Sequence, residues 1–116
     1  MARSNLLKDK SYLFALRIIK LYKYLKSEKK EYVISKQALR SGTAIGALIH
    51  EAEFGQSKAD FISKMSIALK EANETTYWLS LLKDSEYLDE KHYNSIYKDA
   101  KELVALLVAS LKTLKK

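Results

Sequence analysis

Hydrophobic residues recur every three or four positions along most of this chain, and polar connections interrupt the pattern three times. This spacing puts the apolar side chains on one face of an α-helix, whereas a strand would alternate them at every second position. The pattern therefore predicts four helices and no strand. They run from about Asp9 to about Lys26, from Ile34 to a turn at Phe54, from Ser57 to about Lys83, and from Asp89 onward. Because the connections are short, successive helices are expected to lie antiparallel in one all-α bundle covering residues 1–116.

The second predicted helix is the most informative, because most residues on its inward face are small. That face consists of Ile34, Ala38, Ser41, Ile45, Leu48, Ile49 and Ala52, and the outward face of Lys36, Arg40, Thr43 and His50. Gly42 and Gly46 lie beside the inward face, where each glycine costs roughly 1 kcal/mol relative to alanine. Their presence predicts that another backbone passes close to this helix. Gly55 follows the last periodic residue and is expected to end the helix in the left-handed conformation.

The first predicted helix is apolar on more than one side. Its main inward stripe consists of Leu7, Ser11, Phe14, Ala15, Ile18, Leu21, Tyr22 and Leu25. A second apolar set lies away from this stripe and consists of Tyr12, Leu16, Ile19 and Tyr24. A helix with two apolar sides needs two packing partners. Either another helix of the same bundle or another subunit covers the second set, and the exposed flanks of a four-helix bundle favour a subunit.

The composition narrows the class of protein. A chain of 116 residues is long enough for one domain with a single core. It contains no proline, which suits long uninterrupted helices, and no cysteine, which excludes disulfides and cysteine-ligated metals. There is no apolar signal core near the N-terminus and no window that approaches a membrane span. These features predict a soluble, cytoplasmic protein without a membrane partner.

The net charge of +7 is concentrated in the first half of the chain. Residues 1–58 hold 12 of the 21 Lys and Arg residues but only 5 of the 14 Asp and Glu residues. A localised basic excess indicates a polyanionic partner, although lysine-rich faces also serve simply to keep a protein in solution. The candidate nucleic-acid contacts are Arg17, Lys20, Lys23, Lys26, Lys29, Lys30, Lys36 and Arg40. Three nearby tyrosines either stack on bases or pack at helix ends with their hydroxyls in water, namely Tyr22, Tyr24 and Tyr32.

No catalytic or metal-binding motif is recognisable. The three glycines do not form a phosphate-binding loop. Neither His50 nor His92 follows a glutamate by three residues, so the Glu-x-x-His motif of di-iron bundles is absent. Glu71 and Glu74 are expected to be solvated, because nothing in the sequence places them in an apolar pocket. We therefore expect a non-enzymatic protein without a cofactor or a bound metal.

Nearly the whole chain takes part in one resemblance, which lies in the segments 14–19, 35–52, 56–61, 64–79 and 88–94. Together these segments resemble one bacterial family, the 23S rRNA intervening-sequence proteins. The chain departs from the family pattern at Leu48, where an asparagine is usual, but keeps Arg40, Ser41 and Glu51. The resemblance implies an antiparallel, up-down-up-down, left-handed four-helix bundle. It also implies similarity to accessory proteins of diversity-generating retroelements, which form homopentamers with a basic surface and bind nucleic acid and a reverse transcriptase.

Two hypotheses for function follow. The first is a non-enzymatic, oligomeric protein, pentameric by the resemblance, whose basic residues bind the phosphates of RNA or DNA largely without reading sequence. The second is a protein-interaction scaffold whose outer face recruits an enzyme that acts on nucleic acid, such as a reverse transcriptase. The apolar second face of the first helix motivates the scaffold hypothesis.

Overall fold

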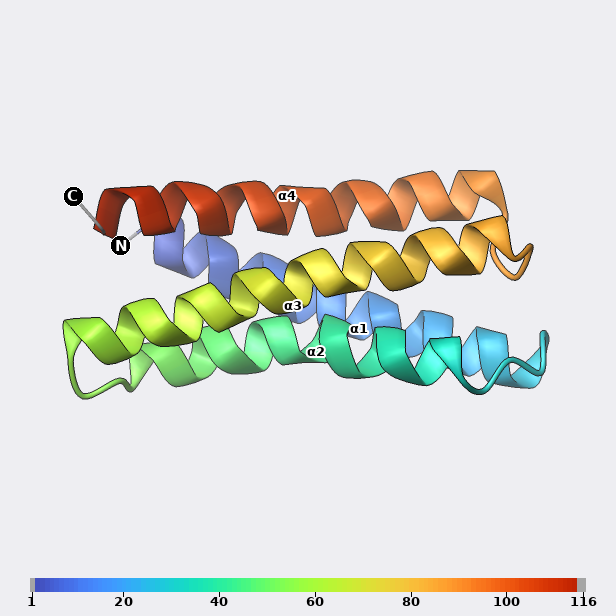
Figure 1. Ribbon diagram of the computed structural model, residues 1–116, viewed down its shortest axis with the longest axis horizontal. Helices are drawn as coiled ribbons and strands as arrows, with labels where there is room; N and C mark the ends of the chain where they lie inside the picture. The colour runs from blue at the N-terminus through green and yellow to red at the C-terminus, as the bar shows by residue number, and fades with distance from the viewer. Residues whose placement is uncertain (1, 115–116) are drawn as a thin grey trace.

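The structure is a computed structural model that describes the backbone of residues 2–114 and the side chains of residues 6–114. It contains four helices in this range: α1 (Ala2–Ser27), α2 (Ile34–Glu53), α3 (Lys58–Asp84) and α4 (Glu90–Leu114). Each helix packs against the next in sequence, and α4 packs back on α1 to close the bundle. The connections α1–α2 and α3–α4 lie at one end of the rod, and the α2–α3 connection lies at the other (Figure 1). The all-α antiparallel bundle predicted from the sequence is confirmed.

The helix α1 begins at Ala2, about two turns before the start expected at Asp9. The sequence offers little signal for this earlier start, because the first turn contains no acidic residue. Packing supplies the reason for the longer helix, since Leu7 is fully buried in the core. The predicted start of this helix was therefore wrong, whereas the prediction that Leu7 faces inward is confirmed.

The core runs the length of the rod, which measures 44 × 21 × 19 Å. Larger side chains come from α1 and α4, and several alanines come from α2 and α3. The buried apolar residues of the four helices are Leu7, Phe14, Ile18, Leu25, Ala38, Ile45, Ile49, Ala52, Met65, Ala68, Ala72, Leu79, Leu82, Ile96, Ala100, Leu103, Leu107 and Leu111. The buried faces of both α2 and α3 contain small residues. Because small side chains let two helices approach closely, these faces suit tight packing of α2 on α3.

The glycines of α2 lie against α1. A methyl group added at Gly42 would lie 2.8 Å from Cγ1 of Ile18, so the close neighbour there is a side chain. At Gly46 the neighbour is a backbone, because the added methyl group would lie 3.4 Å from the carbonyl oxygen of Ser11. The backbone of α1 thus passes beside Gly46, but at a distance that a methyl group would tolerate, whereas Gly42 makes room for the β-branched side chain of Ile18.

The C-terminal end of α2 differs from the expectation for Gly55. Glycines with positive φ are absent from residues 2–114, and the residues that adopt positive φ are Lys30 and Glu86, in the other two connections. The end of α2 is closed by tight bonds from the N–H groups of Phe54 and Gly55 to carbonyl oxygens three residues earlier, both at 3.1 Å. These bonds satisfy the last carbonyls without a left-handed residue.

The helix starts predicted at Ser57 and Asp89 are confirmed, and both residues cap their helices. The Ser57 hydroxyl accepts a hydrogen bond from the N–H of Asp60 at 3.0 Å, and the Asp89 carboxylate accepts one from the N–H of His92 at 2.8 Å. The N-terminus of α2 has a cap that the sequence pattern did not reveal. There the Glu31 carboxylate accepts hydrogen bonds from the N–H groups of three successive residues, Val33, Ile34 and Ser35. This cap fixes the path of the connection into α2.

None of the helices within residues 2–114 carries an apolar stretch long and uncharged enough to cross a lipid bilayer.

Candidate nucleic-acid interface

The basic residues of α1 divide between its two flanks. Arg17 and Lys20 line a hollow on the side of α4, together with Tyr24 and Asp89. Lys23 and Lys26 line a groove on the side of α2. This division follows from their spacing, because residues three apart advance by about 300° around a helix and drift from one flank to the other. The eight predicted basic residues therefore do not form a single cluster.

The two arginines are engaged in ion pairs with other helices. Arg17 donates to the carboxylate of Asp99 at 2.7 Å and to the hydroxyl of Ser95 at 2.6 Å, both on α4. The guanidinium of Arg40 on α2 donates to the carboxylates of two residues of α3, Glu71 at 3.2 Å and Glu74. A phosphate that approached either arginine would have to compete with these carboxylates.

The six lysines of the predicted set differ from the arginines, because none of them forms an ion pair within the described part of the chain. They extend from the second half of α1, through the connection, to the first turn of α2, and all of them are exposed. They are Lys20, Lys23, Lys26, Lys29, Lys30 and Lys36. Their charges are available to an external anion without the loss of an ion pair.

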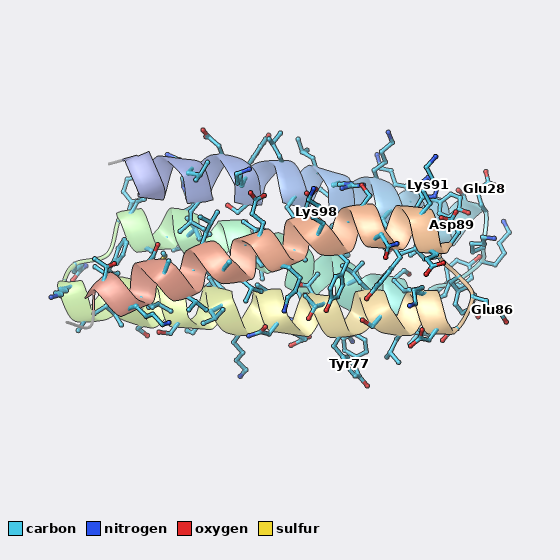
Figure 2. The ribbon with its side chains drawn as sticks, turned by 90° about the horizontal axis from the view of Figure 1, so that it is seen from above. Glu28, Tyr77, Glu86, Asp89, Lys91 and Lys98 are labelled. Carbon is cyan, nitrogen blue, oxygen red and sulfur yellow. The ribbon has the colours of Figure 1, made fainter. Side chains whose placement is uncertain are left out.

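The end of the rod that carries Lys29 and Lys30 is mixed in charge. Figure 2 shows Glu28, Glu86 and Asp89 at this same end. A hollow lined by Lys29 also contains the carboxylates of Glu86, Asp89 and Glu90. Cations and carboxylates therefore lie side by side at this end of the rod. The carboxylates weaken the net attraction of this end for a polyanion.

The groove between α1 and α2 has a different character. Its lining is predominantly apolar, contains two lysines and two tyrosines, and contains no carboxylate. The lining residues are Ile19, Tyr22, Lys23, Lys26, Ser27, Tyr32, Leu39 and Thr43. The ammonium group of Lys26 lies 5.1 Å from the centroid of the Tyr22 ring, a cation–π contact that helps to hold both side chains in place. Of the predicted basic residues, Lys23 and Lys26 are the ones that line a groove with tyrosines and without a carboxylate.

The outward face of α1 carries an apolar cluster nearer its N-terminus. Tyr12, Leu13 and Leu16 are 65%, 63% and 49% exposed, and we call these three residues the outer α1 patch. Leu13 was not among the predicted interface residues. It could have been found in the sequence, because it lies three residues before Leu16 and residues three apart are neighbours on a helix surface. Ile19 and Tyr24, which were predicted to share this surface, lie instead on opposite flanks, in the α2-side groove and the α4-side hollow.

The acidic and histidine residues considered for chemistry have structural contacts. Glu71 and Glu74, expected to be solvated, bind Arg40, and Glu74 also accepts a hydrogen bond from the indole N–H of Trp78 at 2.9 Å. The bonds from Trp78 and Arg40 lower the pKa of Glu74 against the opposing effect of burial. His50 packs on the ring of Phe54, and His92 pairs with Asp89. Residues 6–114 contain no group of three or more His, Asp or Glu side chains arranged to hold a metal ion.

Comparison with known proteins gives a consistent picture. Residues 3–109 match the model of the family described as 23S rRNA-intervening sequence protein. A crystal structure of a protein of unknown function from the S23 ribosomal protein family of Bacteroides thetaiotaomicron is similar to this chain, with 57% sequence identity and a TM-score of 0.94. The alignment covers 95% of this chain and 98% of the other. No curated protein matches.

Proposed function

This chain belongs to the 23S rRNA-intervening sequence protein family, and we propose that it is a non-enzymatic, oligomeric protein that binds nucleic acid through phosphate contacts. The observation that carries the proposal is the set of six lysines, from Lys20 to Lys36, that are exposed and have no carboxylate partner among residues 6–114. The excess charge of the chain lies in the same half. Cations that are not neutralised internally attract the phosphate backbone and release its counterions, which drives binding of either RNA or DNA.

Contacts of this kind do not depend on base sequence. Ammonium groups on long flexible stems act as point charges and contact phosphate oxygens, whereas base reading needs side chains fixed in one orientation. The arginines, which are better suited to directional recognition, are held by Asp99 on α4 and by Glu71 and Glu74 on α3. We therefore assign the phosphate contacts to the lysines and a structural role to Arg17 and Arg40.

A salt series tests this proposal. The measurement is fluorescence anisotropy of a labelled structured RNA and a labelled DNA duplex, with the protein at increasing salt concentrations. Affinity is expected to fall steeply with salt, by a slope of about 0.9 per phosphate contact on duplex DNA. Affinity that is independent of salt would rule the proposal out.

Matched charge reversals locate the interface. The double variant Lys23→Glu/Lys26→Glu is expected to weaken binding and to lower the salt slope. The control is Lys98→Glu/Lys101→Glu, which makes the same change in net charge at two exposed positions of α4 (Figure 2 labels Lys98). Equal loss of affinity in the two double variants would show that only total charge matters and would remove the assignment to α1 and α2.

The proposed oligomer uses the outer α1 patch as its subunit contact. Three large apolar side chains on one exposed surface favour burial against a protein partner, and another copy of the chain is the partner always present. Light scattering measures the mass in solution. Leu13→Lys is expected to dissociate the oligomer, whereas Tyr77→Lys, at a similarly exposed aromatic residue on α3, should not. A native protein that is monomeric at micromolar concentration would contradict the oligomer.

The outer α1 patch also supports the second hypothesis, a scaffold that recruits a nucleic-acid enzyme such as a reverse transcriptase. The two hypotheses differ in what accompanies the protein from its native host. A stoichiometric protein partner in the absence of nucleic acid, lost in Leu13→Lys but kept in Lys23→Glu/Lys26→Glu, would favour the scaffold. Bound nucleic acid that is lost in the lysine variant would favour the first hypothesis.

A further inference from the structure

We infer that the groove between α1 and α2 holds an unpaired nucleotide base, so that the preferred ligand of this protein is single-stranded nucleic acid. The inference rests on the proposed function and adds to it a ligand class and a residue-level site. It starts from the lining of the groove, which combines an apolar surface, two aromatic rings and two cations.

The apolar surface is suited to a planar base. Ile19 on α1 and Leu39 on α2 are both partly buried and both line the groove. Covering them with the face of a base removes apolar area from water, which is favourable. Phosphates and sugars are too polar to gain from such a surface, so contacts to the backbone of a nucleic acid do not account for it.

The tyrosines supply stacking partners. Tyr32 lies in the connection just before α2 and is 54% exposed, so its ring is accessible from the groove. Tyr22 lies on α1 under the ammonium group of Lys26. Stacking of bases on aromatic rings is a general means of binding single strands, and it tolerates any base because every base has a π-face.

The cations lie where the phosphates of such a nucleotide would be. Lys23 and Lys26 line the groove on the side of α1, and Lys36 is exposed on α2 three residues before Leu39, which makes them neighbours on the helix surface. Three other hollows on the molecule each include at least one carboxylate. The first contains Asp89, the second Glu51 and Asp60, and the third Glu86, Asp89 and Glu90. The α1–α2 groove therefore has the charge and the surface that an anionic, planar ligand requires.

The polar groups of the groove predict little discrimination among bases. The hydroxyl of Thr43 donates to the carbonyl oxygen of Leu39 at 2.7 Å, within α2, so its hydrogen is already used. Ser27 likewise donates to the carbonyl oxygen of Lys23 at 2.9 Å. The hydroxyls of Tyr22 and Tyr32 are the other polar groups of the lining, and they lie at the edges of the rings that stack, so stacking and charge remain as the main contacts. A duplex hides its base faces in the helix and would have to unstack a base to use the groove.

The experiment compares three labelled probes of equal length: a homothymidine strand, an abasic strand with the same phosphates and sugars, and a DNA duplex. Anisotropy at one fixed salt concentration gives the affinities of the native protein and of Tyr32→Ala, Tyr32→Phe and Tyr77→Ala. Tyr77 is the matched control, because it is 57% exposed and points away from the bundle on α3 (Figure 2). Thermal unfolding checks that each variant is folded.

The expected result is that the native protein binds the thymidine strand more tightly than the abasic strand. Tyr32→Ala should weaken binding of the thymidine strand by roughly 5- to 100-fold and leave the abasic strand unaffected. Tyr32→Phe keeps the ring and should retain affinity, and Tyr77→Ala should have no effect. Equal binding of the two strands, or an equal loss in Tyr77→Ala, would overturn the inference and leave the proposed function standing. Failure of the native protein to bind any probe would overturn both.

Photocrosslinking provides a second, independent measurement. A strand that carries 5-iodouracil in place of thymine is expected to crosslink to the peptides that contain Tyr22 or Tyr32. Crosslinks confined to α3 and α4 would place the bases elsewhere and would refute the groove as their site, even if single strands are preferred.

Discussion

The carboxylate of Glu31 accepts a hydrogen bond from the backbone N–H of Ser35 at 2.6 Å, and the two residues together close the start of α2. The Ser35 hydroxyl returns a bond to the carbonyl oxygen of Glu31 at 2.9 Å, and both residues are buried. Burial opposes ionisation of Glu31, but the bonds from Ser35, Ile34 and Val33 outweigh it and lower its pKa. The negative charge also lies at the positive end of the α2 dipole.

This cap predicts a specific loss of stability in Glu31→Gln. The amide cannot accept all three N–H bonds and carries no charge, so we expect a cost of about 1–2 kcal/mol in the free energy of unfolding, as for other helix caps. Urea unfolding at neutral pH measures this cost. Glu28→Gln is the control, because Glu28 lies in the same connection but is exposed (Figure 2). A cost shared equally by both variants would show that the cap is not the cause.

The same cap predicts a pH dependence. Because the pKa of Glu31 is lower in the folded than in the unfolded chain, its contribution to stability is fully present above the unfolded pKa of about 4.3 and is lost as the pH falls through the folded value. The difference in unfolding free energy between native protein and Glu31→Gln should therefore shrink below about pH 4. A difference that stays constant as the solution is acidified would contradict this role of the charge.

Replacing each of the two glycines of α2 by alanine is expected to change the stability of the protein in opposite directions. Gly42→Ala would place a methyl group against the β-branched side chain of Ile18, which has little freedom to move, and should destabilise the protein by about 1–3 kcal/mol. Gly46→Ala meets Ser11 only at ordinary contact distance and gains helix propensity, so it should be neutral or stabilising by up to about 1 kcal/mol. Thermal unfolding compares the two. Destabilisation of the same size in both would show that helix packing is tight throughout.

A buried pair of hydroxyls links α2 to α3. The Thr75 and Ser41 hydroxyl oxygens lie 2.9 Å apart, and each residue is fully buried. The Thr75 hydroxyl also donates to the carbonyl oxygen of Glu71 at 2.8 Å, within α3. Thr75→Val keeps the shape and removes both bonds, at an expected cost of about 0.5–1.5 kcal/mol. Ser41→Ala should cost a similar amount, and the double variant less than the sum of the two, because both single changes remove the same bond. Additive losses, measured by urea unfolding, would show that the two hydroxyls act independently.

The ion pairs of the arginines predict that arginine and lysine variants differ in their effect on binding. Lys23→Gln should lower the salt slope for duplex DNA by about 0.9, because one phosphate contact is lost. Arg40→Gln should leave the slope unchanged, because its guanidinium is held by Glu71 and Glu74. A smaller slope in Arg40→Gln would mean that the guanidinium leaves its carboxylates for a phosphate.

The basic residues of the candidate interface could be predicted from composition. Their partners and their positions relative to one another could not. The basic excess identified the lysines as candidates, since sequence alone counts charges. It also grouped Arg17 and Arg40 with them, because the carboxylates that bind these arginines lie 82 and at least 31 residues away in the chain. Tyr24 and Tyr32 looked equivalent in the sequence, yet one lies in the α4-side hollow and the other in the α1–α2 groove.

The sequence by itself determined the four helices, their antiparallel order and the inward faces of α1 and α2. Each of these depends on short-range spacing, which the chain carries residue by residue, and the caps at Ser57 and Asp89 depend only on neighbours within one turn. Only the tertiary structure decided which helix lies beside each flank. That arrangement places carboxylates beside the two arginines, brings Gly42 into contact with Ile18, and leaves the α1–α2 groove without a carboxylate. Those features depend on how the helices are rotated and shifted against one another, and the packing of the whole core sets that relation.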